Sequence, residues 1–217
     1  MNPFIQRHEY NFITKCLSEL NTTLKYCADK NIIETNTICL QEKILGLFNN
    51  LDDKERQLLD ITKIKDPLYI DDYLNNLYRY VYEFPNITNE QIKKIFKKEK
   101  KLKLPDLSME DPKNIYLGWI DEAVRKLFII YNLNGKFLGM SCRLPSFSPG
   151  DNNVCALCNH IGDENEITFV SPICKTNNKD GYKSLGFNIC LDSARCNERI
   201  TSLEKIENII KTVNNIK

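Results

Sequence analysis

The chain has 217 residues, which is enough for one large domain or two small ones. Hydrophobic residues make up 42% of it and charged residues 27%, as is typical of a soluble globular protein. The formal net charge of +1 argues against a molecule that binds polyanions over its whole surface. No apolar run approaches the ~20 residues that a membrane-spanning helix needs, so the composition indicates a globular protein without a membrane segment.

Residues 1–85 have the apolar spacing of amphipathic helices. Ile13, Leu17 and Leu20 recur on one helical face, and Asp66-Pro67 is typical of an N-cap followed by proline at the first helical position. Short connections between such helices favour antiparallel neighbours. The sequence therefore predicts an N-terminal antiparallel four-helix bundle over residues 1–85, with its later helices over 38–48, 58–61 and 70–81.

A lysine-rich segment follows the break at 83–86. Thr88 and Gln91 form a capping box, which predicts a helix that continues through the lysines after residue 96. Lys97, Lys98 and Lys101 are then either a solvated helix face or contacts to RNA phosphates or to an acidic protein surface.

From residue 115 the apolar period changes to two, which indicates strands. They are expected over 116–119, 127–131 and 137–142, with Asn134-Gly135 as a tight turn between the last two. A further hairpin is expected over 167–189, and Thr201 with Glu204 predicts a capping box before a terminal helix. Residues 86–217 are thus predicted to form an α+β domain, with a zinc finger at about 151–200.

Four cysteines carry the clearest chemical signal. Cys155 and Cys158 form a C-x2-C pair, and Cys190 and Cys196 form a C-x5-C pair. Two thiolate pairs brought together make a tetrahedral S4 site, which suits one structural Zn²⁺ with no open coordination position. Disulfides or free thiols are the alternatives, but the charged and polar N-terminus carries no secretion signal, and paired cysteines in a reducing cytoplasm indicate metal ligands. His160 could replace one thiolate.

Motifs for catalysis are missing from the sequence. It contains no glycine-rich phosphate loop and no nucleophile elbow, and His8 and His160 are its two histidines. We therefore expect a protein that is not an enzyme and has no small-molecule substrate.

Taken in order and spacing, several stretches resemble the elongation-factor-G-binding proteins of the fusidic acid resistance type, the FusB/FusC family. The resemblance runs the full length of the chain. It is carried by Phe96-Lys97-Lys98, Lys101-Leu102-Lys103, Pro105-Asp106, Tyr116-Leu117-Gly118-Trp119, Arg125-Lys126, Ile129-Ile130-Tyr131, and, around the cysteines, Tyr182, Gly186, Ile189, Asp192, Ser193 and Asn197.

This resemblance implies a two-domain cytoplasmic protein with a C-terminal treble-clef-like zinc finger. Members bind the translocation GTPase EF-G through the C-terminal domain and promote its departure from ribosomes on which fusidic acid has trapped it. Resistance is then target protection. We expect a monomer with EF-G as its protein partner and the ribosome as a transient one.

The chain departs from the resistance members at their partner contacts. It has Val154 where they carry an aromatic residue, Leu185 and Asn188 where they carry a lysine and a tyrosine, and Ile209 where they carry an aromatic residue in the last helix. Lys183 and Phe187 could supply the same chemistry from shifted positions. The chain is then either a resistance protein or a housekeeping homologue that binds EF-G, and the alternative from another class is a nucleic-acid-binding zinc-finger protein.

Overall fold

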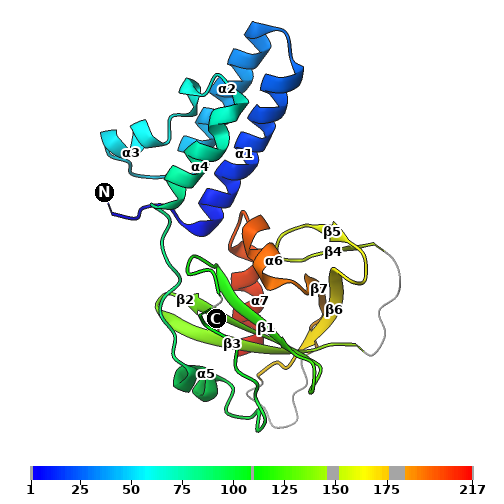
Figure 1. Ribbon diagram of the computed structural model, residues 1–217. Helices are drawn as coiled ribbons and strands as arrows, with labels where there is room; N and C mark the ends of the chain where they lie inside the picture. Colours follow the sequence, from blue (N-terminus) through cyan, green and yellow to red (C-terminus); the bar gives the residue numbers. More distant parts are fainter. Residues whose placement is uncertain (1, 109, 146–151, 176–183, 217) are drawn as a thin grey trace. The chain divides into compact units, whose positions relative to one another are not determined.

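The computed structural model divides the chain into two compact units, Met1–Tyr82 and Glu83–Lys217. It describes residues 2–108, 110–145, 152–175 and 184–216. Each unit has its own hydrophobic core, and Figure 1 shows an all-helical first unit and a second unit built on an antiparallel sheet. Lys183, one of the predicted partner contacts, lies outside the described residues.

The first unit has two long antiparallel helices and several short ones. The long ones are α1 (Arg7–Tyr26) and α2 (Lys30–Leu45). The shorter ones are α3 (Asp53–Leu58), the 3-10 turns η1 (Ile61–Lys63) and η2 (Pro67–Tyr69), and α4 (Ile70–Tyr78). This is the helical N-terminal region that the sequence predicts.

The core of the first unit comes from the predicted apolar stripe. Ile13, Leu17 and Leu20 of α1 are fully buried, together with Leu40 of α2 and Leu77 of α4. At about 25 cal/mol per Å² of apolar surface, each such side chain stabilises the unit by roughly 1.5–3 kcal/mol relative to an exposed position.

Local signals set the helix boundaries in this unit. The Asp29 carboxylate accepts from the N–H groups of Asn31 and Ile32 at the start of α2. Asp66 accepts from the N–H of Leu68, with Pro67 at the first position of η2, as predicted. Such side-chain caps satisfy N–H groups that have no partner inside the helix.

The second unit contains a five-stranded antiparallel sheet in the order β1-β2-β3-β6-β7 and a two-stranded ribbon of β4 and β5. Asn134 and Gly135 both have positive φ and form the predicted tight turn between β2 and β3. The strands are β1 (Tyr116–Asp121), β2 (Lys126–Leu133), β3 (Lys136–Arg143), β4 (Asn153–Val154), β5 (Ile161–Gly162), β6 (Ile167–Pro172) and β7 (Phe187–Cys190).

Both faces of the sheet are covered. On one face, Tyr116, Ile129 and Met140 pack with α6 (Ser193–Arg199) and α7 (Glu204–Asn214) in the core that also contains the clustered cysteines. On the other, an aromatic group forms around Phe128, which contacts Phe96 after α5 (Asn89–Ile95) and stacks on Trp119. The sheet is thus the central layer of the unit (Figure 1).

Two local predictions in this unit are wrong. The capping box of Thr88 and Gln91 is present, but α5 ends at Ile95, so Lys97, Lys98 and Lys101 lie beyond the helix. The chain leaves the helix there because the Phe96 ring turns onto Trp119 and Phe128. Similarly, α7 begins with Leu203 at its N-cap position and without a side-chain cap, so the capping box predicted from Thr201 does not form.

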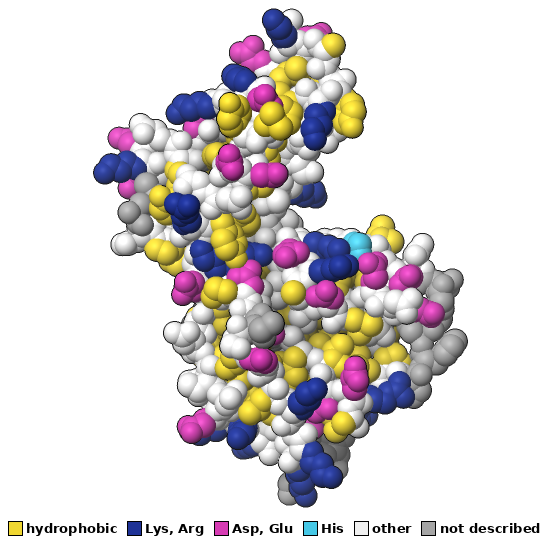
Figure 2. Space-filling view, in the orientation of Figure 1, with side chains coloured by type: hydrophobic (Ala, Val, Ile, Leu, Met, Phe, Trp, Pro, Cys, Tyr) yellow, Lys and Arg dark blue, Asp and Glu magenta, His cyan; other side chains and the backbone are white. Residues whose placement is uncertain are grey.

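Charges of both signs are mixed on the surface. In Figure 2, basic and acidic side chains are interspersed over the visible face of each unit. None of the helices in the described part of the chain is both long and apolar enough to cross a lipid bilayer.

Candidate metal centre and partner surface

Four sulfur atoms gather at one end of the second unit. The Sγ atoms of Cys155, Cys158, Cys190 and Cys196 all lie within 4.8 Å of one another. The Cys155–Cys196 Sγ distance is 3.8 Å and the Cys158–Cys190 distance is 3.6 Å. A tetrahedral zinc with Zn–S bonds of ~2.3 Å separates its sulfurs by ~3.8 Å, so the cluster has the dimensions of a four-thiolate zinc site.

A tight turn after β4 presents the first two thiols. The Cys155 carbonyl accepts from the N–H of Asn159, which has a positive φ of 58°, and the Cys155 N–H donates to the His160 carbonyl. The Ala156 N–H donates to the Asn188 carbonyl at 2.8 Å, which attaches the turn to β7. Cys190, the last residue of β7, is therefore held beside Cys158.

Helix α6 supplies the fourth thiol. Its N-cap residue, Asp192, accepts from the N–H of Arg195. One residue after Cys196, the buried Asn197 side chain accepts from the N–H groups of Ile115 and Tyr116 and donates to the Tyr116 carbonyl. This single amide joins the helix that carries Cys196 to strand β1.

Without a metal, the four neighbouring thiols shift one another's pKa values in opposite directions. Hydrogen bonds from Cys158, Cys190 and Cys196 hold the pKa of Cys155 well below its usual range. The pKa of Cys196 is raised, first because of its hydrogen bond with Cys155. One thiolate is stabilised by its neighbours, but four together need a cation, and Zn²⁺ prefers this donor set.

His160 does not join this cluster. Its Nε2 lies 3.2 Å from the carboxylate of Glu166, the residue before β6. The four thiols therefore form the complete donor set among the described residues, and the alternative in which His160 replaces one of them has no support.

The predicted partner residues that the structure describes lie on several elements of the second unit, namely β4, β7, the segment before β7, and α7. Val154 is 50% exposed on β4, and the Asn188 side chain contacts Asn153 beside it. Leu185, Phe187 and Ile209 are partly buried and pack against the main core of the unit.

Comparison with known proteins follows the same division into two units. Residues 4–85 match the family model described as elongation factor G-binding protein, N-terminal. Residues 91–215 match the FBP C-terminal treble-clef zinc-finger. The chain belongs to the EF-G-binding proteins of the FusB/FusC type.

A solved structure agrees with this assignment. "Structure of the fusidic acid resistance protein FusC" aligns with a TM-score of 0.80 and 26% identity, over 99% of each chain. A comparison with curated proteins gives no significant match. As in its family, the treble-clef end of this EF-G-binding protein holds one structural Zn²⁺.

Lysines of this EF-G-binding protein gather near the end of α5. Burial lowers the pKa of Lys175, and the nearby charges of Lys136, Lys98 and Lys97 lower it further. Glu99, the acid within the lysine run, pairs instead with Lys126 at 2.7 Å. The charges of Lys97 and Lys98 thus act on the pKa of a lysine that is distant in the sequence.

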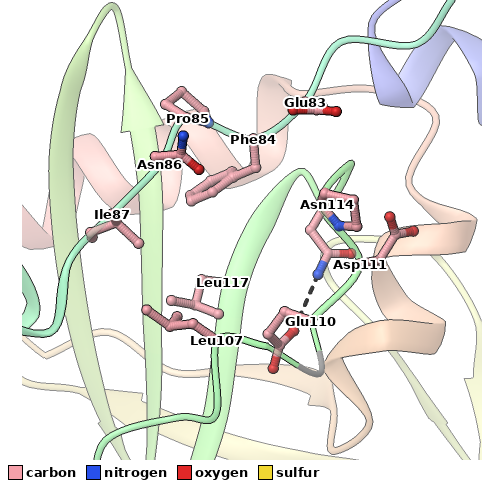
Figure 3. Close-up of a pocket in the computed structure, with 11 residues that line it drawn as sticks. Glu83, Phe84, Pro85, Asn86, Ile87, Leu107, Glu110, Asp111, Asn114 and Leu117 are labelled. Carbon is pink, nitrogen blue, oxygen red and sulfur yellow. Dashed lines mark hydrogen bonds between the residues drawn. The ribbon is translucent and has the colours of Figure 1, made fainter. Parts of the chain in front are cut away.

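A pocket of about 150 Å³ opens over Leu117 of β1, on the sheet face away from Tyr116. Figure 3 shows the Phe84 ring above Leu117 and Leu107, and Asn114 donates to Glu110 at the rim. Burial raises the pKa of Glu110, and the charges of Asp106 and Asp111 raise it further. Typical ligand pockets have volumes of at least about 300 Å³. This pocket has half that volume and is too small for a drug-sized molecule.

Sequence reasoning missed the structural role of Asn197, which it named only as part of the family resemblance, and it missed Phe169 altogether. The role of Asn197 depends on Ile115, 82 residues away, and no local signal reveals it. Phe169 is 48% exposed on β6, between buried neighbours. Alternation along β6 would not have found it, because the fully buried Ile167 lies on the same face of the strand.

Proposed function

We propose that this protein binds EF-G through its second unit and promotes the release of EF-G from the ribosome. On this proposal Cys155, Cys158, Cys190 and Cys196 hold the zinc and brace the surface that EF-G meets. The protein then acts in the cytoplasm as a monomer and without catalysis. The outcome is either fusidic acid resistance by target protection or a housekeeping function in translation.

The four-thiol cluster within a treble-clef family match is the observation that carries this proposal. A metal with four protein ligands has no open position for a substrate, which favours a structural role over a catalytic one. A zinc-braced end loses little conformational entropy on binding, and a folded partner such as EF-G suits a rigid surface of this kind.

Calorimetry with EF-G of the same host tests the first step. We expect one-to-one binding with a Kd in the micromolar range or tighter, about −8 kcal/mol. The absence of binding at tens of micromolar protein would refute the proposal.

The release step needs a separate measurement. Ribosomes carrying EF-G trapped by fusidic acid should lose EF-G faster when the protein is added, without modification of the drug or of EF-G. If EF-G binds to the free protein but its departure rate from the ribosome is unchanged, then the binding step stands and the release step is wrong.

A second candidate is contact with ribosomal RNA through the lysines that follow α5 in the sequence. Replacing Lys97, Lys98 and Lys101 by Gln should then weaken ribosome association. It should also flatten the plot of log affinity against log salt concentration, whose slope falls by up to about one for each phosphate contact that is lost. If these lysines are a solvated surface, the triple variant will match the wild type at every salt concentration.

A further inference from the structure

The pairing of β6 with β7 assigns each side chain to one of two faces. Phe169 lies opposite Asn188, and Val170 lies opposite Phe187. Because side chains alternate along a strand and paired residues share a face, Phe169 and Asn188 point to one side and Phe187 to the other. The two phenylalanines of this hairpin therefore cannot serve one flat surface.

The face of Phe169 is the zinc face. Ile167 and Cys190 form the next pair on the same side, and Cys190 is one of the clustered thiols. The β4–β5 ribbon adjoins this side, since the Asn188 amide donates to the Asn153 side chain at 3.2 Å. Phe169, Asn188 and the ribbon are consequently neighbours at the zinc end.

Apolar side chains are exposed at this end. Val154 and Ile161 are paired across the ribbon and are 50% and 63% exposed, and Phe169 is 48% exposed. Among the described residues of the second unit, Phe169 is the aromatic side chain with a large exposed fraction. Phe187, by comparison, packs against the main core.

The Phe169 ring is held in place by its neighbour across the hairpin. A Cβ atom at Gly186 would collide with the tip and edge of this ring, so the ring lies directly on the Gly186 backbone. An exposed aromatic that is already fixed loses little rotamer freedom on binding, which is a property of interface anchors.

From this arrangement we infer that Phe169 is the aromatic anchor for EF-G, on a surface formed with Val154, Ile161 and Asn188. The inference rests on the proposed function, and it selects the zinc face of the hairpin rather than the face of Phe187. EF-G is the occupant because both units of the chain match the EF-G-binding family, whose zinc finger this surface adjoins.

Calorimetry of the full-length zinc protein with EF-G tests the inference, using Phe169→Ala and, as a matched control on the other face, Phe187→Ala. We expect Phe169→Ala to raise Kd at least about tenfold and Phe187→Ala to raise it less than about threefold. Phe169→Tyr, which keeps the ring, should bind within about threefold of the wild type.

The outcomes separate the two proposals. If the wild type fails to bind EF-G, the proposed function is refuted. If the wild type binds and Phe169→Ala binds equally well, or if Phe187→Ala has the larger effect, only the anchor assignment is overturned.

A second measurement, on the wild-type protein, tests the inference even if the alanine variant misfolds. Should Phe169→Ala lose zinc, hydrogen exchange of the wild-type protein with and without EF-G decides. We expect EF-G to slow exchange at 153–154, 161–162 and 168–170, and unchanged exchange in these segments would overturn the inference.

Discussion

The two units of this protein are stabilised in different ways. The first consists of helices whose core side chains come from a repeating apolar stripe, such as Leu17 and Leu20 in α1. The second buries three of its four clustered thiols in the same core as Tyr116, Ile129 and Ile206, and the half-buried Cys158 packs against that core. A helical hairpin is thus complete with apolar contacts alone, whereas the sheet unit depends on an ion at its core.

This difference predicts independent responses to damage. Metal binding contributes about 10–16 kcal/mol in isolated finger peptides, which is as large as the whole stability of a typical domain. Loss of the ion should therefore disrupt the second unit and leave the helices of the first.

Removing one thiol should have the largest effect. Cys190→Ala leaves three thiolates, so we expect zinc content to fall from one per chain to near zero and the second unit to lose its protection from hydrogen exchange. The amides of α1 and α2 should stay protected. Cys39→Ala, which removes an exposed thiol in α2, is the control and should leave both zinc and exchange unchanged. A zinc-free Cys190→Ala protein with full protection of its sheet would contradict the prediction.

The counterpart of this test is a substitution that leaves a cavity in the core of the first unit. Leu17 is fully buried, so Leu17→Ala should destabilise that unit by about 2–5 kcal/mol and lower its melting transition. The zinc content should remain one per chain. Ile38→Ala on α2, where the side chain is 48% exposed, should change stability by about 0.5 kcal/mol or less. Loss of zinc in Leu17→Ala would show that the units depend on each other.

A smaller, pH-dependent effect is expected at the pocket in Figure 3. The raised pKa of Glu110 means that folding favours its protonated form, so ionisation costs stability as the pH rises above the ordinary value of 4.5. Glu110→Gln should therefore be slightly more stable than the wild type at pH 7.5, by about 0.5 kcal/mol or less given its exposure, and the gain should shrink toward pH 5. Urea unfolding at the two pH values measures this, and a wild type that is the more stable at pH 7.5 would contradict it.

The sequence predicts features that depend on local spacing. The stripe around Leu17, the turn at Asn134-Gly135 and the cluster of four cysteines are all confirmed, because each is set by residue types at short, fixed intervals. Helix boundaries depend on more. The lysines after Phe96 were expected to be helical, but the contact of that ring with Trp119 and Phe128 ends the helix earlier.

Features that depend on distant pairing were out of reach of the sequence. The face that Phe169 occupies is fixed by its pairing with Asn188, and the position of Asn197 is fixed by strand β1. The same holds for Lys175, whose pKa is lowered by burial and by the charges of lysines from other parts of the chain. Periodicity alone identifies which residues alternate but not which side of a sheet meets a metal or a solvent-exposed surface.

The span of the zinc ligands has a consequence for biosynthesis. Cys155 and Cys196, whose sulfurs lie 3.8 Å apart, are separated by 41 positions, and Cys196 follows Tyr82, the end of the first unit, by 114. At about 5–20 residues per second, a ribosome needs roughly 6–23 s to make that stretch. The helical unit can therefore fold while the chain is still growing. The zinc site, by contrast, is incomplete until Cys196 has been synthesised, because Cys155, Cys158 and Cys190 supply only three of its ligands. We expect metal capture to be among the last events in making this protein, and cells short of zinc to accumulate chains with a folded first unit and an unfolded second one.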